Sequence, residues 1–187
     1  MNQNLTRCPW CGSDPLYVKY HDEEWGKEVH DDNVLFEFLV LESAQAGLSW
    51  ITVLRKRESY REAFAQFDAR QVARFTSEDV ERLLQNPGII RNRMKIEAAI
   101  NNAKLFLEVQ REFGSFRKFL YSFMPEGKPI VNNPASIKDV PTRTEISDEI
   151  AKDMKKRGFK FFGTTICYAH MQATGMVNDH ITACSFR

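Results

Sequence analysis

Apolar residues recur along most of the chain every three or four positions, which is the spacing of an amphipathic α-helix. One such segment begins after Asp31, a favourable N-cap residue. Its apolar face carries Leu35, Phe38 and Ala46, and Gly47 ends it. We therefore predict a helix over about 31–47.

The same spacing predicts further helices over about 49–67, 76–84, 91–113, 116–123, 147–157 and 164–173. In the first of these, Arg55, Lys56 and Arg57 are expected to face solvent. Thr76-Ser77-Glu78-Asp79 is a capping-box signature. Residues 125–142 contain four prolines and are expected to form a long loop. Because no convincing alternating strand is present, we predict an all-α protein forming a single domain over 1–187.

Composition places this chain among soluble globular proteins. Lys and Arg total 26 and Asp and Glu total 25, for a net charge of +1, so any nucleic-acid binding must depend on a local patch. Four cysteines without an apolar leader favour a reduced, cytoplasmic location. No apolar run approaches the roughly 18 residues of a membrane span, and we expect no membrane partner.

Two cysteine–histidine pairs lie at opposite ends of the sequence: Cys8 with His21, and His180 with Cys184. The i, i+4 spacing of the second pair would place both side chains on one face of a helical turn. Two thiolates and two imidazoles satisfy tetrahedral Zn²⁺ without leaving a position for water. The set therefore predicts one structural zinc ion that joins the two ends of the chain.

Alternatives remain for these residues. His180 could be an ordinary surface residue and Cys184 a small apolar one near a frayed end. Cys8 and Cys11 also form a C-x-x-C pair, which fits a redox dithiol, a zinc knuckle that uses both thiols, or one ligand beside a bystander. Spacing alone does not choose between Cys8 and Cys11.

Glu42 is the most unusual charged residue in the pattern. It follows Phe38 by four positions and precedes Ala46 by four, so it lies on the apolar face of its helix. A buried, unpaired carboxylate costs several kcal/mol, which predicts a partner, an altered protonation state or a ligand. The alternative is a wide apolar face with Glu42 exposed at its edge.

Aromatic residues gather near Glu42 in the sequence. The set comprises Trp10, Tyr17, Tyr20, Trp25 and Trp50. Each could simply pack in the core, but aromatic faces also stack on nucleobases and attract cations. Aromatic rings around a carboxylate predict a pocket for a planar, positively charged ligand.

Two segments are candidates for binding a DNA strand. Residues 86–93 form a Pro-Gly turn that leads into a helix, where free N–H groups and the side chains of Arg91, Arg93 and Lys95 could hold a phosphate. Thr164 and Thr165 begin a later helix after a second basic cluster. Both signals are weak, because basic residues usually face solvent without a ligand.

Together these residues closely resemble the 3-methyladenine DNA glycosylase I family of the helix-hairpin-helix superfamily. The resemblance rests on the blocks Asp14–Tyr17, Tyr20–Gly26, Leu41-Glu42, Gln45–Leu54, Gly88–Arg91, Lys156–Phe161, Gly163–Thr165 and Val177–His180. These blocks are long and extend through most of the chain.

The resemblance implies a role for each candidate. It implies zinc ligands at Cys8, His21, His180 and Cys184, with Cys11 and Cys167 as bystanders. The implied base pocket holds Glu42, Tyr17, Tyr20 and Trp50, with Trp10 and Trp25 in it or beside it. The implied DNA contacts are the segment that fills the gap in the duplex, at Gly47 and Leu48, and the hairpin, at Gly88, Ile89, Arg91 and Arg93, together with Thr164 and Thr165.

The implied activity is base-excision repair of double-stranded DNA. Such an enzyme flips an alkylated base into the pocket, hydrolyses the N-glycosidic bond, releases 3-methyladenine and leaves an abasic site. No aspartate occurs between Asp79 and Asp139, and the family likewise lacks the catalytic aspartate of its superfamily. We therefore expect a monofunctional, monomeric glycosylase without a lyase step. The alternative is a zinc-stapled DNA-binding module without catalysis.

Overall fold

A computed structural model describes residues 5–187 as a helical protein with one two-stranded sheet. The elements in chain order are η1 (Pro9–Cys11), α1 (Pro15–Glu23), α2 (Asp32–Gln45), α3 (Trp50–Leu54), α4 (Arg57–Ala63), η2 (Ala65–Phe67), α5 (Ala69–Val72), α6 (Ser77–Leu84), α7 (Arg93–Phe113), α8 (Phe116–Tyr121), η3 (Pro125–Gly127), β1 (Ile130–Val131), η4 (Ile137–Asp139), α9 (Glu145–Arg157), α10 (Thr164–Ala173) and β2 (Val177–Asn178). The predicted all-α class is confirmed at the level of a helical fold.

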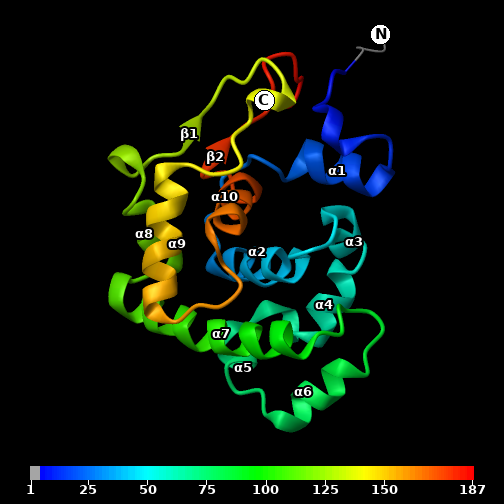
Figure 1. Ribbon diagram of the computed structural model, residues 1–187, viewed down its shortest axis with the longest axis vertical. Coiled ribbons are helices and arrows are strands. Elements are labelled where there is room, and N and C mark those ends of the chain that lie inside the picture. The colour runs from blue at the N-terminus through cyan, green and yellow to red at the C-terminus, as the bar shows by residue number, and fades with distance from the viewer. Residues whose placement is uncertain (1–4) are drawn as a thin grey trace.

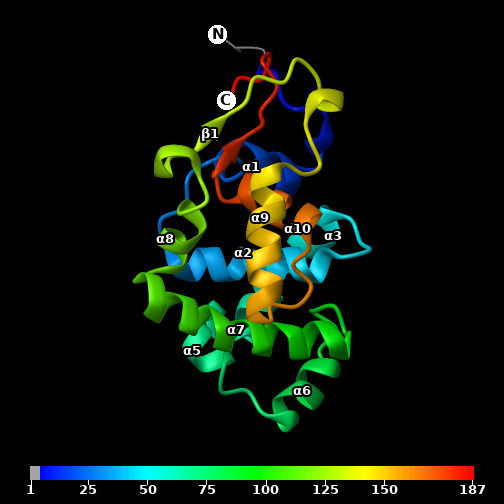
Figure 2. The same cartoon turned by 60° about the vertical axis from the view of Figure 1, so that its left-hand side comes forward.

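Helix α2 runs through the centre of the molecule. Figures 1 and 2 show α1 and the chain ends on one side of it and α5, α6 and α7 on the other. Helices α3, α7, α8 and α10 all contact α2. Every residue from Leu35 to Ala44 is buried, so α2 is enclosed on all sides rather than along one stripe. Polar side chains on α2 must therefore find partners inside the protein.

Several helix ends follow the local signals in the sequence. Asp31 accepts a hydrogen bond from the backbone N–H of Asn33 at the start of α2. The capping box between Thr76 and Asp79 forms as predicted. Gly158 ends α9 in the left-handed conformation that favours glycine. Helix α10 has the predicted bounds.

The predicted helix over 49–67 is wrong, because this segment is divided into α3, α4 and η2. The break after Leu54 directs Arg57 inward, where its guanidinium donates hydrogen bonds to Glu37 and Glu24. A second break follows α4, where Ala65–Phe67 adopts positive φ angles. Buried ion pairs between residues that are distant in sequence thus accompany the departure from the local helical pattern.

The prediction that strands are absent also needs correction. β1 and β2 pair in parallel, with Ile130 opposite Val177 and Val131 opposite Asn178. Strands of two residues are too short to show an alternating pattern in the sequence. Their pairing fastens the proline-rich loop 125–142 to the segment after α10.

The first residues that the structure describes and the C-terminal segment lie side by side, as Figure 2 shows. Thr6 and Ser185 exchange two hydrogen bonds, from Ser185 N to Thr6 O at 2.8 Å and from Thr6 N to Ser185 Oγ at 3.0 Å. Across residues 5–187, no helix combines the length and apolar character needed to cross a membrane.

Candidate active site and metal centre

A cavity of about 380 Å³ opens between the N-terminal segment, α2, α3 and α10. It is lined by Trp10, Tyr17, Tyr20, Trp25, Glu42, Gln45, Trp50, Ile137, Val140, Pro141, Thr142, Thr165, Tyr168, Ala169 and Gln172. All six residues expected in the base pocket are among them. The volume and the six aromatic residues of the lining suit a small planar ligand.

Aromatic rings form most of one wall of the cavity. The Trp10 ring lies 5.0 Å from that of Tyr17 and 5.0 Å from that of Trp25. Tyr20 and Trp50 meet at 5.5 Å between ring centroids. The Nε1–H groups of Trp10 and Trp50 are buried and have no hydrogen-bond acceptor within residues 5–187. Unpaired donors of this kind are available to a polar ligand.

Glu42 is the single carboxylate among the described residues that line the cavity. Its side chain is 3% exposed, and Oε2 has no hydrogen-bond partner within residues 5–187. Burial raises the pKa of Glu42 from its ordinary value of 4.5 to about 8. The alternative of an exposed Glu42 is thereby excluded. A carboxyl group held in this way gains from any ligand that brings positive charge or hydrogen-bond donors.

Another wall comes from one face of α10, of which only Thr165 was singled out from the sequence, as a DNA contact. Thr165, Tyr168 and Gln172 recur at helical spacing and line the cavity. The Tyr168 hydroxyl and Gln172 Nε2 each donate to Asp179 Oδ2 at 2.7 Å, and Asn132 Nδ2 donates to the other oxygen at 2.7 Å. The buried Asp179 carboxylate therefore fixes the side chains of Tyr168 and Gln172 in this wall. The helical spacing within 164–173 could have identified this face as part of the cavity lining. The loop residues 137–142 carry no pattern that identifies them as lining residues.

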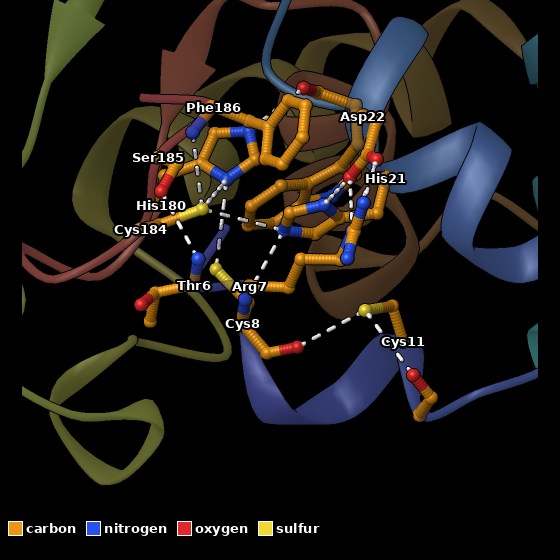
Figure 3. A network of polar contacts seen from close by, with 12 residues as sticks. Thr6, Arg7, Cys8, Cys11, His21, Asp22, His180, Cys184, Ser185 and Phe186 are labelled. Atoms are coloured by element: carbon orange, nitrogen blue, oxygen red, sulfur yellow. Dashed lines mark hydrogen bonds and ion pairs between the residues drawn. The ribbon is translucent and has the colours of Figure 1, made fainter. Parts of the chain in front are cut away.

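The predicted metal ligands come together in a buried cluster, shown in Figure 3. Ligand atoms of Cys8, His21, His180 and Cys184 all lie within 4.8 Å of one another. His180 Nδ1 is 3.5 Å from Cys8 Sγ and 3.3 Å from Cys184 Sγ, and His21 Nε2 is 3.6 Å from Cys184 Sγ. The expected helical turn at 180–184 is not formed; a hydrogen-bonded turn brings this pair together instead. The cluster has the donor set and spacing to hold a metal ion.

The outer nitrogen of each imidazole is held by a fixed acceptor. Asp22 Oδ1 lies 2.7 Å from His21 Nδ1, and the Trp25 carbonyl oxygen lies 3.1 Å from His180 Nε2. Partners of this kind orient metal-binding histidines. Cys11 lies apart from the four ligands in Figure 3, where its thiol donates to the Cys8 carbonyl oxygen at 3.2 Å.

The cluster is continuous with the aromatic wall of the cavity. The Trp25 ring is 4.7 Å from that of His180, and the Trp10 ring is 5.2 Å from that of His21. His21 also follows Tyr20 directly on α1. An interaction that holds the four ligands together therefore also positions the rings of Trp10, Tyr20 and Trp25 in the cavity wall.

The turn between α6 and α7 was expected to offer free backbone N–H groups to a phosphate. Three of these N–H groups instead donate hydrogen bonds within the protein. Gly88 N–H donates to Asn86 Oδ1 at 2.8 Å, and Ile90 N–H donates to the Tyr60 hydroxyl at 3.1 Å. Ile89 is a buried core residue, and its N–H donates to the Asn86 carbonyl oxygen at 3.4 Å. A side chain at Gly88 would collide with Ser59. These amides are thus occupied within the protein.

The basic side chains beside this turn differ in their partners. Arg91 is exposed and forms no ion pair with any of residues 5–187. Arg93 is also exposed, but it pairs with Glu81 at 2.6 Å. Lys95 donates to two backbone carbonyl groups at the end of α2.

The other expected DNA contacts lie near the cavity. Gly47 and Leu48 follow α2 directly and are exposed, with Leu48 41% exposed despite its apolar side chain. Thr165 lines the cavity. Thr164 is half-buried, and its hydroxyl bonds to Asp148 and lies 3.1 Å from Ser147 Oγ, so it joins α10 to α9.

Comparisons with known proteins agree with this geometry. Residues 10–187 match the family model described as methyladenine glycosylase. The chain is 52% identical over 180 residues to DNA-3-methyladenine glycosylase 1 of Escherichia coli and 51% identical over 179 residues to DNA-3-methyladenine glycosylase of Haemophilus influenzae, covering 96% of each chain in both cases.

A solved structure of a 3-methyladenine DNA glycosylase I variant in complex with 3-methyladenine has the same fold. Its TM-score is 0.93 at 38% identity, with 96% of each chain covered. The expected family is therefore confirmed: this chain belongs to the methyladenine glycosylase family.

Proposed function

We propose that this protein is a DNA-3-methyladenine glycosylase that acts in base-excision repair. Family membership and the activities of the bacterial relatives support this function. The observation that carries it is a buried, unpaired Glu42 in an aromatic cavity. A binding module without catalysis would have no need for an unpaired carboxyl group in its interior, because burial of that group destabilises the fold.

The cavity favours a cationic base over a neutral one. Methylation at N3 of adenine places a positive charge on the base in DNA and weakens its bond to the sugar. Rings of Tyr20 and Trp50 would stack on this base, while Glu42 would accept hydrogen bonds from its amino edge. An ionised Glu42 is stabilised by the bound cation, so binding is coupled to loss of its proton. With a pKa of about 8 in the empty cavity, Glu42 makes affinity for a cationic base rise with pH up to that value.

To reach the cavity, the damaged nucleotide must rotate out of the duplex at a cost of a few kcal/mol. The exposed Leu48 lies on the turn directly after α2, where it would enter the gap left in the duplex. Arg91 and Arg93 would hold the DNA backbone beyond the α6–α7 turn, with Gly88 and Ile89 shaping that turn rather than donating to phosphate. Thr165 would contact the strand at the cavity mouth, and Thr164 would fix the start of α10.

Cleavage would require little more than electrostatic stabilisation. Within the described lining no second carboxylate accompanies Glu42, and no lysine is present to form a Schiff base. We infer a monofunctional reaction in which Glu42 stabilises positive charge as the N-glycosidic bond breaks and water completes hydrolysis. The product is an intact strand with an abasic site.

We further propose that Cys8, His21, His180 and Cys184 hold one structural zinc ion. Two sulfur and two nitrogen donors, with both imidazoles oriented from outside, fit this ion. Four protein ligands leave no position for a reacting water, so zinc would supply only a fixed connection between the chain ends. The wall formed by Trp10 and Trp25 would depend on this connection.

Metal analysis of matched variants tests the zinc site. Cys8→Ser should lose the metal and several kcal/mol of folding stability, because metal binding is coupled to folding. Cys11→Ser should retain the full metal content, since Cys11 lies outside the cluster. Equal metal loss in both variants would contradict the assignment of ligands.

Chromatography of bases released from methylated duplex DNA tests the proposed function. We expect 3-methyladenine to be released and the strand to stay uncleaved until treated with alkali. DNA binding without any released base would favour the alternative, a zinc-stapled binding module. We expect the active species to be a monomer that acts on cytoplasmic, nucleoid DNA.

A further inference from the structure

Lys95 makes two contacts that no part of the proposed chemistry requires. Its ammonium group donates to the carbonyl oxygen of Ala44 at 2.8 Å and to that of Ala46 at 2.7 Å. These carbonyl groups belong to the C-terminal end of α2, whose last N–H partners are missing in any helix. A lysine at this end also interacts favourably with the helix dipole. Lys95 therefore caps the helix that carries Glu42.

The capped residues lead directly into an exposed turn. Ala46 is the C-cap of α2, Gly47 has a φ of +82°, and Leu48 N–H donates to the Gln45 carbonyl oxygen at 2.6 Å. This turn consists of residues 46–48, and we call it the insertion turn. Within residues 46–48, the polar contacts are this local hydrogen bond and the contact of Lys95 with the Ala46 carbonyl oxygen, so Lys95 supplies the link to another part of the fold.

Lys95 itself is rigidly placed by the α6–α7 turn. It lies in the first turn of α7, where its backbone N–H donates to the Asn92 side chain at 3.2 Å. The preceding turn is fastened to α4 and its neighbours, since Lys56 Nζ donates to the Pro87 carbonyl oxygen at 2.8 Å and Ile90 N–H bonds to Tyr60. Lys95 thus connects the insertion turn to the start of α7, which lies about 50 residues further along the sequence.

Lys95 differs from the basic residues beside it. It forms no ion pair with any of residues 5–187, and burial lowers its pKa. Arg91 is exposed without an ion pair among residues 5–187 and Arg93 is exposed but paired with Glu81, whereas Lys95 is half-buried and donates to two carbonyl groups. Its charge is therefore directed at the protein rather than at a phosphate.

Building on the proposed function, we propose that Lys95 is a positioning residue that fixes the insertion turn relative to the α6–α7 turn. When the α6–α7 turn engages the DNA backbone, the insertion turn is then held at the distance needed to enter the duplex. Removing Lys95 would leave the base cavity intact but would uncouple backbone binding from insertion. Misplacement of a positioning element by about 1 Å can cost about 100-fold in rate.

Three variants separate this role from loss of charge or of stability. Lys95→Met keeps the length of the side chain but removes its donors, and Lys95→Arg restores a cation with several donors. Lys104→Met removes the same charge from an exposed position on α7. Each protein is examined for thermal stability, binding of free 3-methyladenine, and single-turnover release of 3-methyladenine from duplex DNA.

Insertion is measured separately on DNA that cannot react. A duplex with a tetrahydrofuran abasic analogue carries 2-aminopurine beside the gap, and its fluorescence reports how the insertion turn enters the stack. For Lys95→Met we expect an excision rate about 10- to 100-fold lower and a reduced fluorescence change, with free-base affinity within about 2-fold of the unaltered protein. Lys95→Arg should recover most of both signals, and Lys104→Met should leave both unchanged.

The result that would overturn this proposal is a Lys95→Met protein that matches Lys104→Met in excision and in fluorescence. A parallel loss of free-base binding would also overturn it, because it would show that Lys95 supports the cavity instead. If the unaltered protein released no 3-methyladenine, the proposed function would fail, while the fluorescence measurement would still test the role of Lys95.

Discussion

Glu37 and Glu42 are both buried on α2, but Glu37 is paired with arginines whereas Glu42 has an oxygen without a hydrogen-bond partner among residues 5–187. Glu37 is 6% exposed, and one of its oxygens accepts hydrogen bonds from Arg57 and from Arg61, the latter at 2.9 Å. Glu42 is 3% exposed and has an oxygen without any partner among residues 5–187. The two glutamates are five positions apart on the same helix.

This contrast shows how to distinguish a structural charge from a functional one. At Glu37 the protein supplies two guanidinium groups, and a third interaction joins Arg57 to Glu24 at 2.6 Å. At Glu42 it supplies aromatic rings and open volume instead. A buried charge that the fold neutralises serves stability, whereas one left unneutralised is available to a ligand.

Replacing Glu37 should give the largest change in stability. Glu37→Gln leaves Arg57 buried with one carboxylate fewer, and breaking such a pair costs about 3–5 kcal/mol. Glu58→Gln is the matched control, since Glu58 contacts the same Arg61 from an exposed position. Urea denaturation of both variants measures the difference. Equal stabilities would show that the Glu37 network contributes no more than a surface ion pair.

Replacing Trp50 should weaken ligand binding by a smaller amount. Trp50→Leu removes an aromatic face from the cavity, and base–aromatic stacking is worth about 1–3 kcal/mol. Titration with free 3-methyladenine, followed by calorimetry, measures this loss. Phe64→Leu is a control in the distant aromatic cluster that Phe64 forms with Tyr60 and Phe67. An undiminished affinity in Trp50→Leu would remove this ring from the binding site.

Over a single pH unit, the pH dependence of stability should show the smallest effect. The pKa of Glu42 is about 8 in the folded protein and near its ordinary value of 4.5 when unfolded. Between these values the folded state retains a proton that the unfolded state has lost, so the free energy of unfolding falls as pH rises. The contribution is at most about 1.4 kcal/mol per pH unit.

Glu42→Gln isolates this contribution because glutamine does not titrate. Denaturation of both proteins at several values between pH 5 and 8 should give a steeper decline for the unaltered protein, while below pH 4.5 the two slopes should converge. Identical slopes throughout would mean that Glu42 is ionised in the empty cavity.

The features that the sequence predicted correctly are those that depend on interactions between residues close together in the chain. Helix α10 and the capping box at Thr76 follow from local hydrogen bonds and apolar spacing. The burial of Glu42 also followed from its place between Phe38 and Ala46. Resemblance to a known family supplied the roles that spacing could not decide, including the choice of Cys8 over Cys11.

What the sequence did not predict depends on contacts between distant segments. Arg57 lies inward, where it pairs with Glu24 and Glu37, and the helix that local spacing would continue is divided just before it. The cavity wall at 137–142 is placed by β1 pairing with β2, some 47 residues later. A local window of the sequence contains neither the glutamates that pair with Arg57 nor the strand that pairs with β1.

Single-turnover excision by Glu42→Gln tests the central claim most directly. Loss of a preorganised charge of this kind lowers a rate by about 100- to 1,000-fold. We predict such a loss of 3-methyladenine release from duplex DNA for Glu42→Gln, with folding stability at neutral pH unchanged or increased. Excision at the rate of the unaltered protein would contradict the claim that Glu42 stabilises positive charge as the N-glycosidic bond breaks.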